Sequence, residues 1–125
     1  MTSKQELEEH LSLTKKSERN EVCPIKSVLE LIGGKWKMRI LYTISREEIS
    51  RFNELKRHIS GITNTMLSNS LHELENDKFI TRTQYNEMPL RVEYTLTDLG
   101  ESFLPLFNGI SSWWDNYSSY KTPEN

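Results

Sequence analysis

The apolar residues of this chain repeat with a spacing that changes along the sequence, and this order limits the fold more than any single residue does. From Cys23 to Asn76 they recur every three or four residues, which predicts helices. From Phe79 to Leu96 β-branched and aromatic residues dominate, which predicts a β-hairpin. An apolar helix then closes the chain. Helices followed by a hairpin predict a mainly α-helical winged helix-turn-helix fold with a small β-hairpin wing.

The segment 51–76 is expected to form a helix, a tight turn and a second helix. Gly61 should make the turn, because glycine enters left-handed backbone conformations at little cost. Thr63 is a natural N-cap for the second helix, since its hydroxyl can accept a hydrogen bond from a free N–H of the first turn. The apolar residues of that helix, which should face the core, are Leu67, Leu71 and Leu74.

The opposite face of this second helix carries short polar side chains, where a merely solvated helix usually carries glutamate and lysine. Asparagine can bond adenine bidentately, and serine and threonine can bond phosphates or bases. This composition predicts a recognition helix that enters a DNA major groove, and a solvated face is the alternative. The residues expected to contact DNA here are Thr63, Asn64, Thr65, Ser68, Asn69 and His72.

Basic residues gather in one part of this chain of 125 residues, although its net charge is only −2. Between Lys35 and Arg57 seven basic residues stand against three acidic ones, which favours contact with phosphate. In the hairpin, Arg91 is expected to enter a minor groove or hold a phosphate, and the alternative is a stem that lies along the sheet. The expected phosphate-contacting cations are Lys35, Lys37, Arg39, Arg51, Arg82 and Arg91.

The last helix should begin after Thr97 as N-cap and kink at Pro105. Its apolar residues alternate spacings of four and three, as in a coiled-coil seam. Leaving such a face in water would cost roughly 1.5–3 kcal/mol per large side chain, so a second copy of the chain is the expected cover. Packing on its own domain is the alternative. The expected dimer-interface residues are Leu99, Phe103, Leu106, Phe107, Ile110, Trp113, Trp114 and Tyr117.

Two regions are expected: a polar extension over residues 1–22, either a short helix or a frayed tail, and one domain over residues 23–121. No segment has the apolar length of a membrane span or of a signal peptide, so a cytoplasmic protein without membrane contact is expected. The single cysteine excludes an internal disulfide and fits a reducing compartment.

An enzyme is not expected. The three histidines, His10, His58 and His72, fall on unrelated elements. The sequence contains neither paired carboxylates nor a phosphate-cradling glycine loop, and metal-ligand spacing is absent as well. Neither a metal nor a cofactor is therefore expected.

Several motifs, in order, resemble the HxlR-type winged helix-turn-helix regulators, small bacterial relatives of the MarR group. The resemblance implies a homodimer whose recognition helices enter successive major grooves while its wings touch flanking DNA. One departure is the turn before the first wing strand, where relatives carry a glycine and this chain has Asp77-Lys-Phe79. The motifs are Cys23-Pro-Ile, Ile32-Gly-Gly-Lys-Trp36 followed by Ile40-Leu41, Phe52-Asn-Glu-Leu55, Ile59-Ser-Gly-Ile62, Met66-Leu67 and Arg91-Val-Glu-Tyr-Thr-Leu-Thr-Asp-Leu-Gly100.

Cys23 is a candidate redox or electrophile sensor. Some HxlR-type regulators sense oxidants through the cysteine aligned with it. A cysteine at a helix start lies near the positive end of the helix dipole, which stabilises the thiolate. A lone thiol can still form a disulfide with Cys23 of a second copy, or an adduct with an electrophile. The alternative is an inert residue kept by packing.

Two other functions fit the same residues. One is a regulator with an inert Cys23 that binds a small ligand in an aromatic pocket near Trp36, Phe103, Phe107 or Trp113. The other is a winged-helix interaction module that does not bind DNA. The neutral recognition face permits such a module, whereas the cations of the first helices argue against it.

Overall fold

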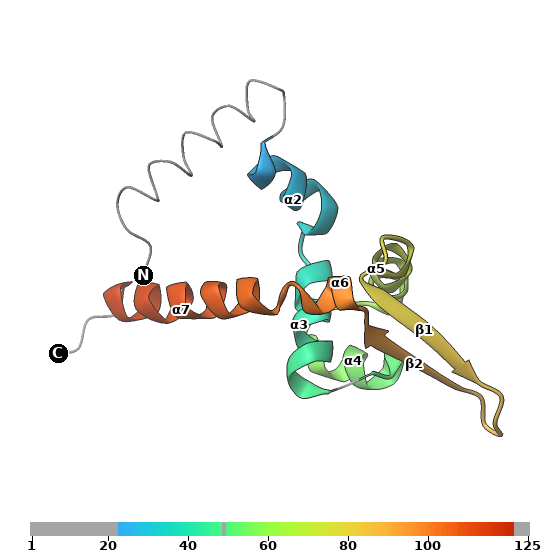
Figure 1. Ribbon diagram of the computed structural model, residues 1–125. Helices are drawn as coiled ribbons and strands as arrows, with labels where there is room; N and C mark the ends of the chain where they lie inside the picture. The colour runs from blue at the N-terminus through green and yellow to red at the C-terminus, as the bar shows by residue number, and fades with distance from the viewer. Residues whose placement is uncertain (1–22, 49, 122–125) are drawn as a thin grey trace. The chain divides into compact units, whose positions relative to one another are not determined.

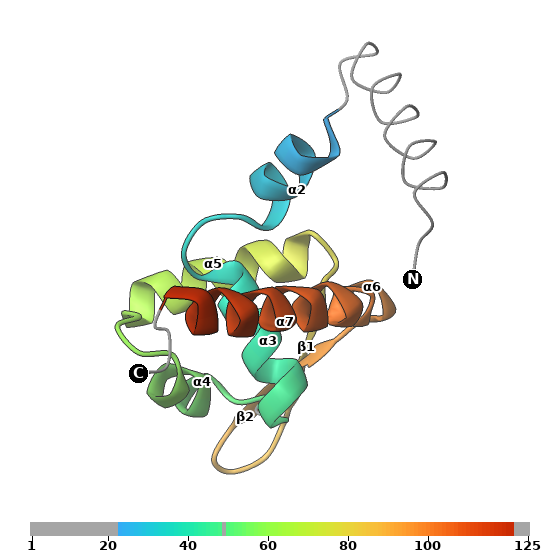
Figure 2. The same cartoon turned by 90° about the vertical axis from the view of Figure 1, so that its left-hand side faces the viewer.

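The computed structural model describes residues 23–48 and 50–121, and the chain forms two units, one ending at Gly34 and one beginning at Lys35. The described helix of the first unit is α2 (Pro24–Ile32), labelled in Figures 1 and 2. Pro24 opens it, because the N–H that proline lacks would be unpaired there. The extension expected over residues 1–22 lies outside the described residues.

The two glycines that end α2 serve different purposes. Gly33 has ordinary backbone angles, but a Cβ on it would clash with the carbonyl oxygen of Leu29. Gly34 takes the left-handed conformation, with φ of +87°. The second glycine therefore provides the left-handed conformation, while the first is needed for the close approach to Leu29.

The second unit confirms the predicted order of helices, hairpin and closing helix (Figure 1). The two strands are antiparallel, with Ile80 opposite Leu96 at the base and Tyr85 opposite Arg91 near the tip. The fold is thus mainly α-helical with a two-stranded wing. Its elements are α3 (Lys37–Glu47), α4 (Phe52–His58), α5 (Asn64–Asn76), β1 (Ile80–Tyr85), β2 (Arg91–Leu96), α6 (Asp98–Glu101) and α7 (Leu104–Lys121).

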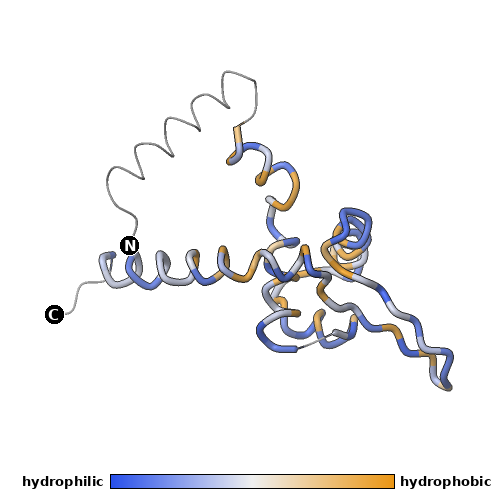
Figure 3. Tube along the Cα trace, viewed as in Figure 1, coloured by the Kyte–Doolittle hydropathy of each residue, from blue (hydrophilic) through white to orange (hydrophobic). Residues whose placement is uncertain are grey.

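The core of the second unit lies where α3, α4 and α5 meet the base of the hairpin. Apolar residues recur among polar ones along these helices, as the hydropathy colouring in Figure 3 shows. Phe52, the first residue of α4, is only half-buried. The residues with at most 7% exposure are Ile40, Leu41, Ile44, Leu55, Ile59, Ile62, Leu67, Leu71, Leu74, Phe79, Ile80 and Phe107.

Both ends of α5 are fixed by local hydrogen bonds. At its start the Met66 N–H donates to the hydroxyl of Thr63 at 3.1 Å, which confirms the predicted N-cap. At its end Lys78 donates to the Glu75 carbonyl and Phe79 to the Leu74 carbonyl, the bonding pattern of a Schellman motif. Lys78 takes φ of +70°, so a lysine occupies the left-handed position of this motif, which glycine usually fills.

The predicted continuous last helix is wrong. Thr97 does cap a helix, since its hydroxyl accepts the N–H of Gly100 at 3.1 Å, but that helix, α6, ends at Glu101. A second helix, α7, begins at Leu104, with Pro105 in its first turn. Proline fits a first turn, where it breaks no hydrogen bond, so the chain stops one turn before Pro105 and restarts rather than bending at it.

None of the helices in the described part of the chain is long and apolar enough to cross a lipid bilayer.

Candidate nucleic-acid interface

The exposed face of α5 holds all the side chains expected to contact bases. Its apolar stripe is inside the protein, because Leu67, Leu71 and Leu74 are each at most 1% exposed. The helix is therefore fixed by its buried side while the opposite side is free for a ligand. The predicted contact residues, all of them exposed, are Thr63, Asn64, Thr65, Ser68, Asn69 and His72.

Trp36 supports the turn that precedes α5, a role the sequence analysis missed. Its ring lies 3.8 Å from where a Cβ of Gly61 would be, and Gly61 takes the expected left-handed conformation with φ of +85°. The same ring has Lys35 Nζ at 4.9 Å and the Arg39 guanidinium at 5.1 Å from its centroid. Arg39 also donates to the carbonyl of Ser60, at 3.4 Å. Lys35 and Arg39 are both exposed.

Lys37 lies differently from the other two cations of this segment. Its side chain is only 19% exposed, and its Nζ is 2.7 Å from Oε2 of Glu73 on α5. The lysine expected to contact phosphate is thus turned towards a carboxylate of its own chain.

Arg51 precedes α4 and is exposed, at the edge of a cleft of about 350 Å³ between α4 and the wing. Arg57, which the sequence analysis did not single out, lines the same cleft. Arg91 lines it from the wing, and Glu54 is the acidic residue among them. The structure thus brings together three arginines from two elements.

The two wing arginines differ in their surroundings. Arg82 is exposed and donates to Gln84 Oε1 at 3.3 Å. Arg91 is held by two carboxylates, with Glu87 Oε1 at 3.2 Å and Glu93 Oε2 at 3.5 Å. A phosphate that bound Arg91 would have to displace both, so the structure favours the alternative reading of a side chain lying along the hairpin.

The apolar side chains from α6 to the end of α7 are split between the core of the chain and its surface. Phe107 is 4% exposed and packs edge-on against Tyr42, with ring centroids 5.6 Å apart. Phe103 is half-buried against Phe79, at 5.3 Å. These two residues, expected at a dimer interface, therefore pack within the protomer. The other expected interface residues are exposed: Leu99, Leu106, Ile110, Trp113, Trp114 and Tyr117.

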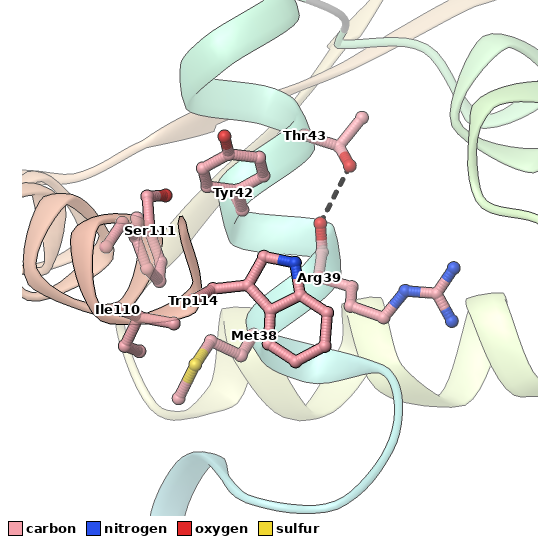
Figure 4. A pocket seen from close by; sticks show the side chains of 8 residues that line it. Met38, Arg39, Tyr42, Thr43, Ile110, Ser111 and Trp114 are labelled. Carbon is pink, nitrogen blue, oxygen red and sulfur yellow. Dashed lines mark hydrogen bonds between the residues drawn. The ribbon is translucent and has the colours of Figure 1, made fainter. Parts of the chain in front are cut away.

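A pocket of about 370 Å³ lies between α3 and α7 (Figure 4). Trp114 and Ile110 of α7 face Met38 and Tyr42 of α3 across it, and the Arg39 guanidinium points away. Thr43, on the same wall, donates to the carbonyl of Arg39 at 2.7 Å. The lining is mainly apolar. Of the four aromatic residues expected around a ligand pocket, Phe107 lines this one.

Cys23 lies in the first unit, half-buried, at the N-cap of α2. Its carbonyl accepts the N–H of Ser27 at 3.0 Å, and its side chain makes no capping hydrogen bond. Within residues 23–48 and 50–121, no group of three or more His, Cys, Asp or Glu side chains is placed to hold a metal ion.

Comparison with known proteins shows the family to which this chain is similar. The model of the HxlR-like helix-turn-helix family matches residues 31–122. YdzF, an uncharacterised HTH-type transcriptional regulator of Bacillus subtilis (strain 168), is 46% identical over 95 residues, which are 76% of this chain and 87% of that protein.

Two solved structures are similar to this chain over most of its length. The redox regulator HypR in its reduced form has a TM-score of 0.71 and 35% identity, covering 78% of this chain and 95% of that one. The reduced form of the transcriptional regulator YodB from B. subtilis has a TM-score of 0.66 and 29% identity, covering 83% and 99%.

Proposed function

The chain belongs to the HxlR-like helix-turn-helix family of transcriptional regulators, and we propose that it acts as a homodimer that binds a pseudo-palindromic double-stranded DNA operator. Two α5 helices would enter major grooves about one helical turn apart, roughly 34–36 Å. The wings would then touch the flanking DNA.

The observation that carries this proposal is the division of α5 into a buried and an exposed side. Leu67, Leu71 and Leu74 fix the helix, while the exposed side offers amide and hydroxyl groups. Asn64 and Asn69 are the residues best suited to read adenine, because an amide can bond its N6 and N7 together. Thr65 and Ser68 suit thymine methyls or phosphates.

Phosphate contact in this proposal comes from exposed cations. Lys35, Arg39, Arg51 and Arg82 are exposed and belong to elements around α5 or to the wing. Each neutralised phosphate adds about 0.9 to the slope of log affinity against log salt. Four such residues per protomer predict steep salt dependence.

The dimer would form through the exposed aromatic side of α7. Trp113 and Trp114 are 63% and 57% exposed, and their rings lie against Tyr117. Aromatic residues that remain exposed in a protomer are typical anchors of an interface. A two-fold axis would place the same residues of both copies face to face.

The first experiment is affinity selection of sheared genomic DNA by the purified, reduced protein at physiological salt. Enrichment of a two-fold symmetric site, bound by two chains, supports the proposal. A folded dimer that enriches no site contradicts operator binding and favours an interaction module or a regulator that needs a ligand to bind.

A second function, a redox or electrophile response, is favoured by the position of Cys23 and by the similarity to the redox regulator HypR. Oxidation would join Cys23 to the same residue of the partner copy, with loss of two thiol protons and transfer of two electrons to the oxidant. Cys23→Ser should bind DNA as the wild type does and ignore diamide. Equal diamide responses in the two proteins contradict this role.

A further inference from the structure

Lys37 and Glu73 join the helix before the helix-turn-helix to the recognition helix itself. Lys37 is the first residue of α3, and Glu73 lies in the C-terminal half of α5. Their charged atoms are 2.7 Å apart, the shortest ion pair among the described residues. The lysine side chain is 19% exposed, whereas that of Glu73 is 56% exposed. The pair is therefore well shielded on the lysine side.

An ammonium held in this way contributes little to phosphate binding. Salt-dependent affinity comes from counterions released when a free cation meets a phosphate. To bind a phosphate, Lys37 would first have to leave the Glu73 carboxylate, which lies at hydrogen-bonding distance. Exchanging one anion for another in this way neutralises no additional charge. The geometry suits a contact that fixes one helix against another.

A second contact from α3 reaches the other end of α5. Arg39 donates to the carbonyl of Ser60, in the turn just before α5, and its guanidinium covers Trp36. The Trp36 ring in turn lies close to Gly61. Contacts from α3 thus fix both the turn that leads into α5 and the far half of α5.

We propose that Lys37 is a positioning residue, whose ion pair with Glu73 sets the orientation of α5 in the major groove, and that it contacts no phosphate. This inference rests on the proposed function, since it assigns a role in DNA binding. It also assigns Glu73, a negative charge on the recognition helix, a favourable role in that binding.

The test is a double-mutant cycle on operator affinity, measured across a range of salt concentrations. Lys37→Met should weaken binding by about tenfold at every salt concentration and leave the salt slope unchanged. Glu73→Gln should weaken it by a similar factor, although it removes a negative charge. The double variant should bind less weakly than the product of the two single effects, because both substitutions remove the same contact.

Matched control variants separate a role in positioning α5 from a direct contact with phosphate. Lys35→Met, two residues away, removes an exposed lysine and should lower the salt slope by about 0.9. Glu75→Gln removes the other acid of α5 and should not weaken binding. Tighter binding by Glu73→Gln, or a salt slope lowered by Lys37→Met, would overturn the inference.

The free protein provides a test that does not depend on DNA. Amide hydrogen exchange in α5 should be about tenfold faster in Lys37→Met and in Glu73→Gln than in the wild type, and unchanged in Lys35→Met. Unchanged exchange in both variants would overturn the inference. Failure of the wild type to select an operator would instead contradict the proposed function, and would leave this exchange result to decide whether the pair positions α5.

Discussion

The guanidinium carbon of Arg91 lies 4.1 Å from the centroid of the Tyr85 ring, and the two residues are direct partners across the hairpin. Glu87 and Glu93 bind the same guanidinium from the loop and from its own strand. An arginine with an aromatic ring and two carboxylates around it joins the two strands near the tip of the wing. The sequence predicts DNA contact for Arg91, and the structure shows its guanidinium held within the hairpin.

Exchanging each wing arginine for glutamine should separate these roles. Arg82→Gln removes an exposed cation and should lower the salt slope of operator binding by about 0.9 without changing stability. Arg91→Gln should leave the slope nearly unchanged and lower the free energy of unfolding by about 1 kcal/mol, through lost cation–π and ion-pair contacts.

Salt titrations of affinity and urea unfolding of the same samples measure both quantities. A salt slope lowered equally by the two substitutions would show that Arg91 leaves its carboxylates to bind phosphate in the complex.

Replacing Lys78 with glycine should stabilise the protein. It takes φ of +70° in the Schellman motif after α5, a conformation in which a side chain is strained. Lys78→Gly relieves that strain and should raise the free energy of unfolding by about 0.5–1 kcal/mol. Lys78→Ala, the control, keeps a Cβ and should give no such gain. Equal unfolding midpoints for the glycine and alanine variants would contradict this account.

Two glycines near the C-terminus should respond oppositely to alanine. A Cβ on Gly100 would clash with the Phe79 carbonyl oxygen, which is fixed by the N–H of Thr97 at 3.1 Å. Gly100→Ala should therefore lower the free energy of unfolding by about 1–3 kcal/mol. A Cβ on Gly109 meets no atom of the described residues within 4 Å.

Gly109→Ala should accordingly stabilise α7 by about 0.5–1 kcal/mol, as alanine does in a helix interior. Unfolding at one fixed protein concentration compares the two variants, because dimer formation would make the midpoint depend on concentration. A destabilising Gly109→Ala would indicate that this glycine is covered in the assembled protein.

The elements that sequence reasoning predicted best are those with a strong local signal. The leucine spacing of α5 shows directly which side is buried, and a threonine before it is sufficient to place its start. The hairpin follows from the β-branched and aromatic residues of its strands. Such signals need only neighbours in the sequence.

The features that sequence reasoning missed concern side chains whose partners are distant in sequence or selected by packing. Nothing near Lys37 in the sequence identifies Glu73 as its partner, so the basic stretch predicts phosphate contact for all of its cations alike. Phe103 packs against Phe79 from the break between α6 and α7, and Phe107 packs against Tyr42 from α7, whereas the sequence shows only an uninterrupted apolar repeat. For Arg91 one neighbour is predictable from the sequence, because hairpin pairing places Tyr85 directly across from it.

Substitutions at Phe107 and Trp113 should separate two roles of α7, which are packing into the core and forming the proposed dimer. Phe107 is 4% exposed and packs with Tyr42 and Phe103, so Phe107→Ala should lower protomer stability by about 3–5 kcal/mol. Trp113 is 63% exposed, so Trp113→Ala should leave protomer stability nearly unchanged. If Trp113 anchors the proposed dimer, its loss should raise the dimer dissociation constant about thirtyfold, the usual effect of removing an interface hot spot.

Sedimentation equilibrium measures the association and urea unfolding measures the stability. Ser112→Ala, next to Trp113 on the same helix, is the control and should change neither quantity. An unchanged dimer in Trp113→Ala, with protomers still associated at micromolar concentration, would place the interface elsewhere. Because the exposed aromatic side of α7 would then have no cover, the pocket that Trp114 forms with α3 would become the first place to look for a small apolar ligand.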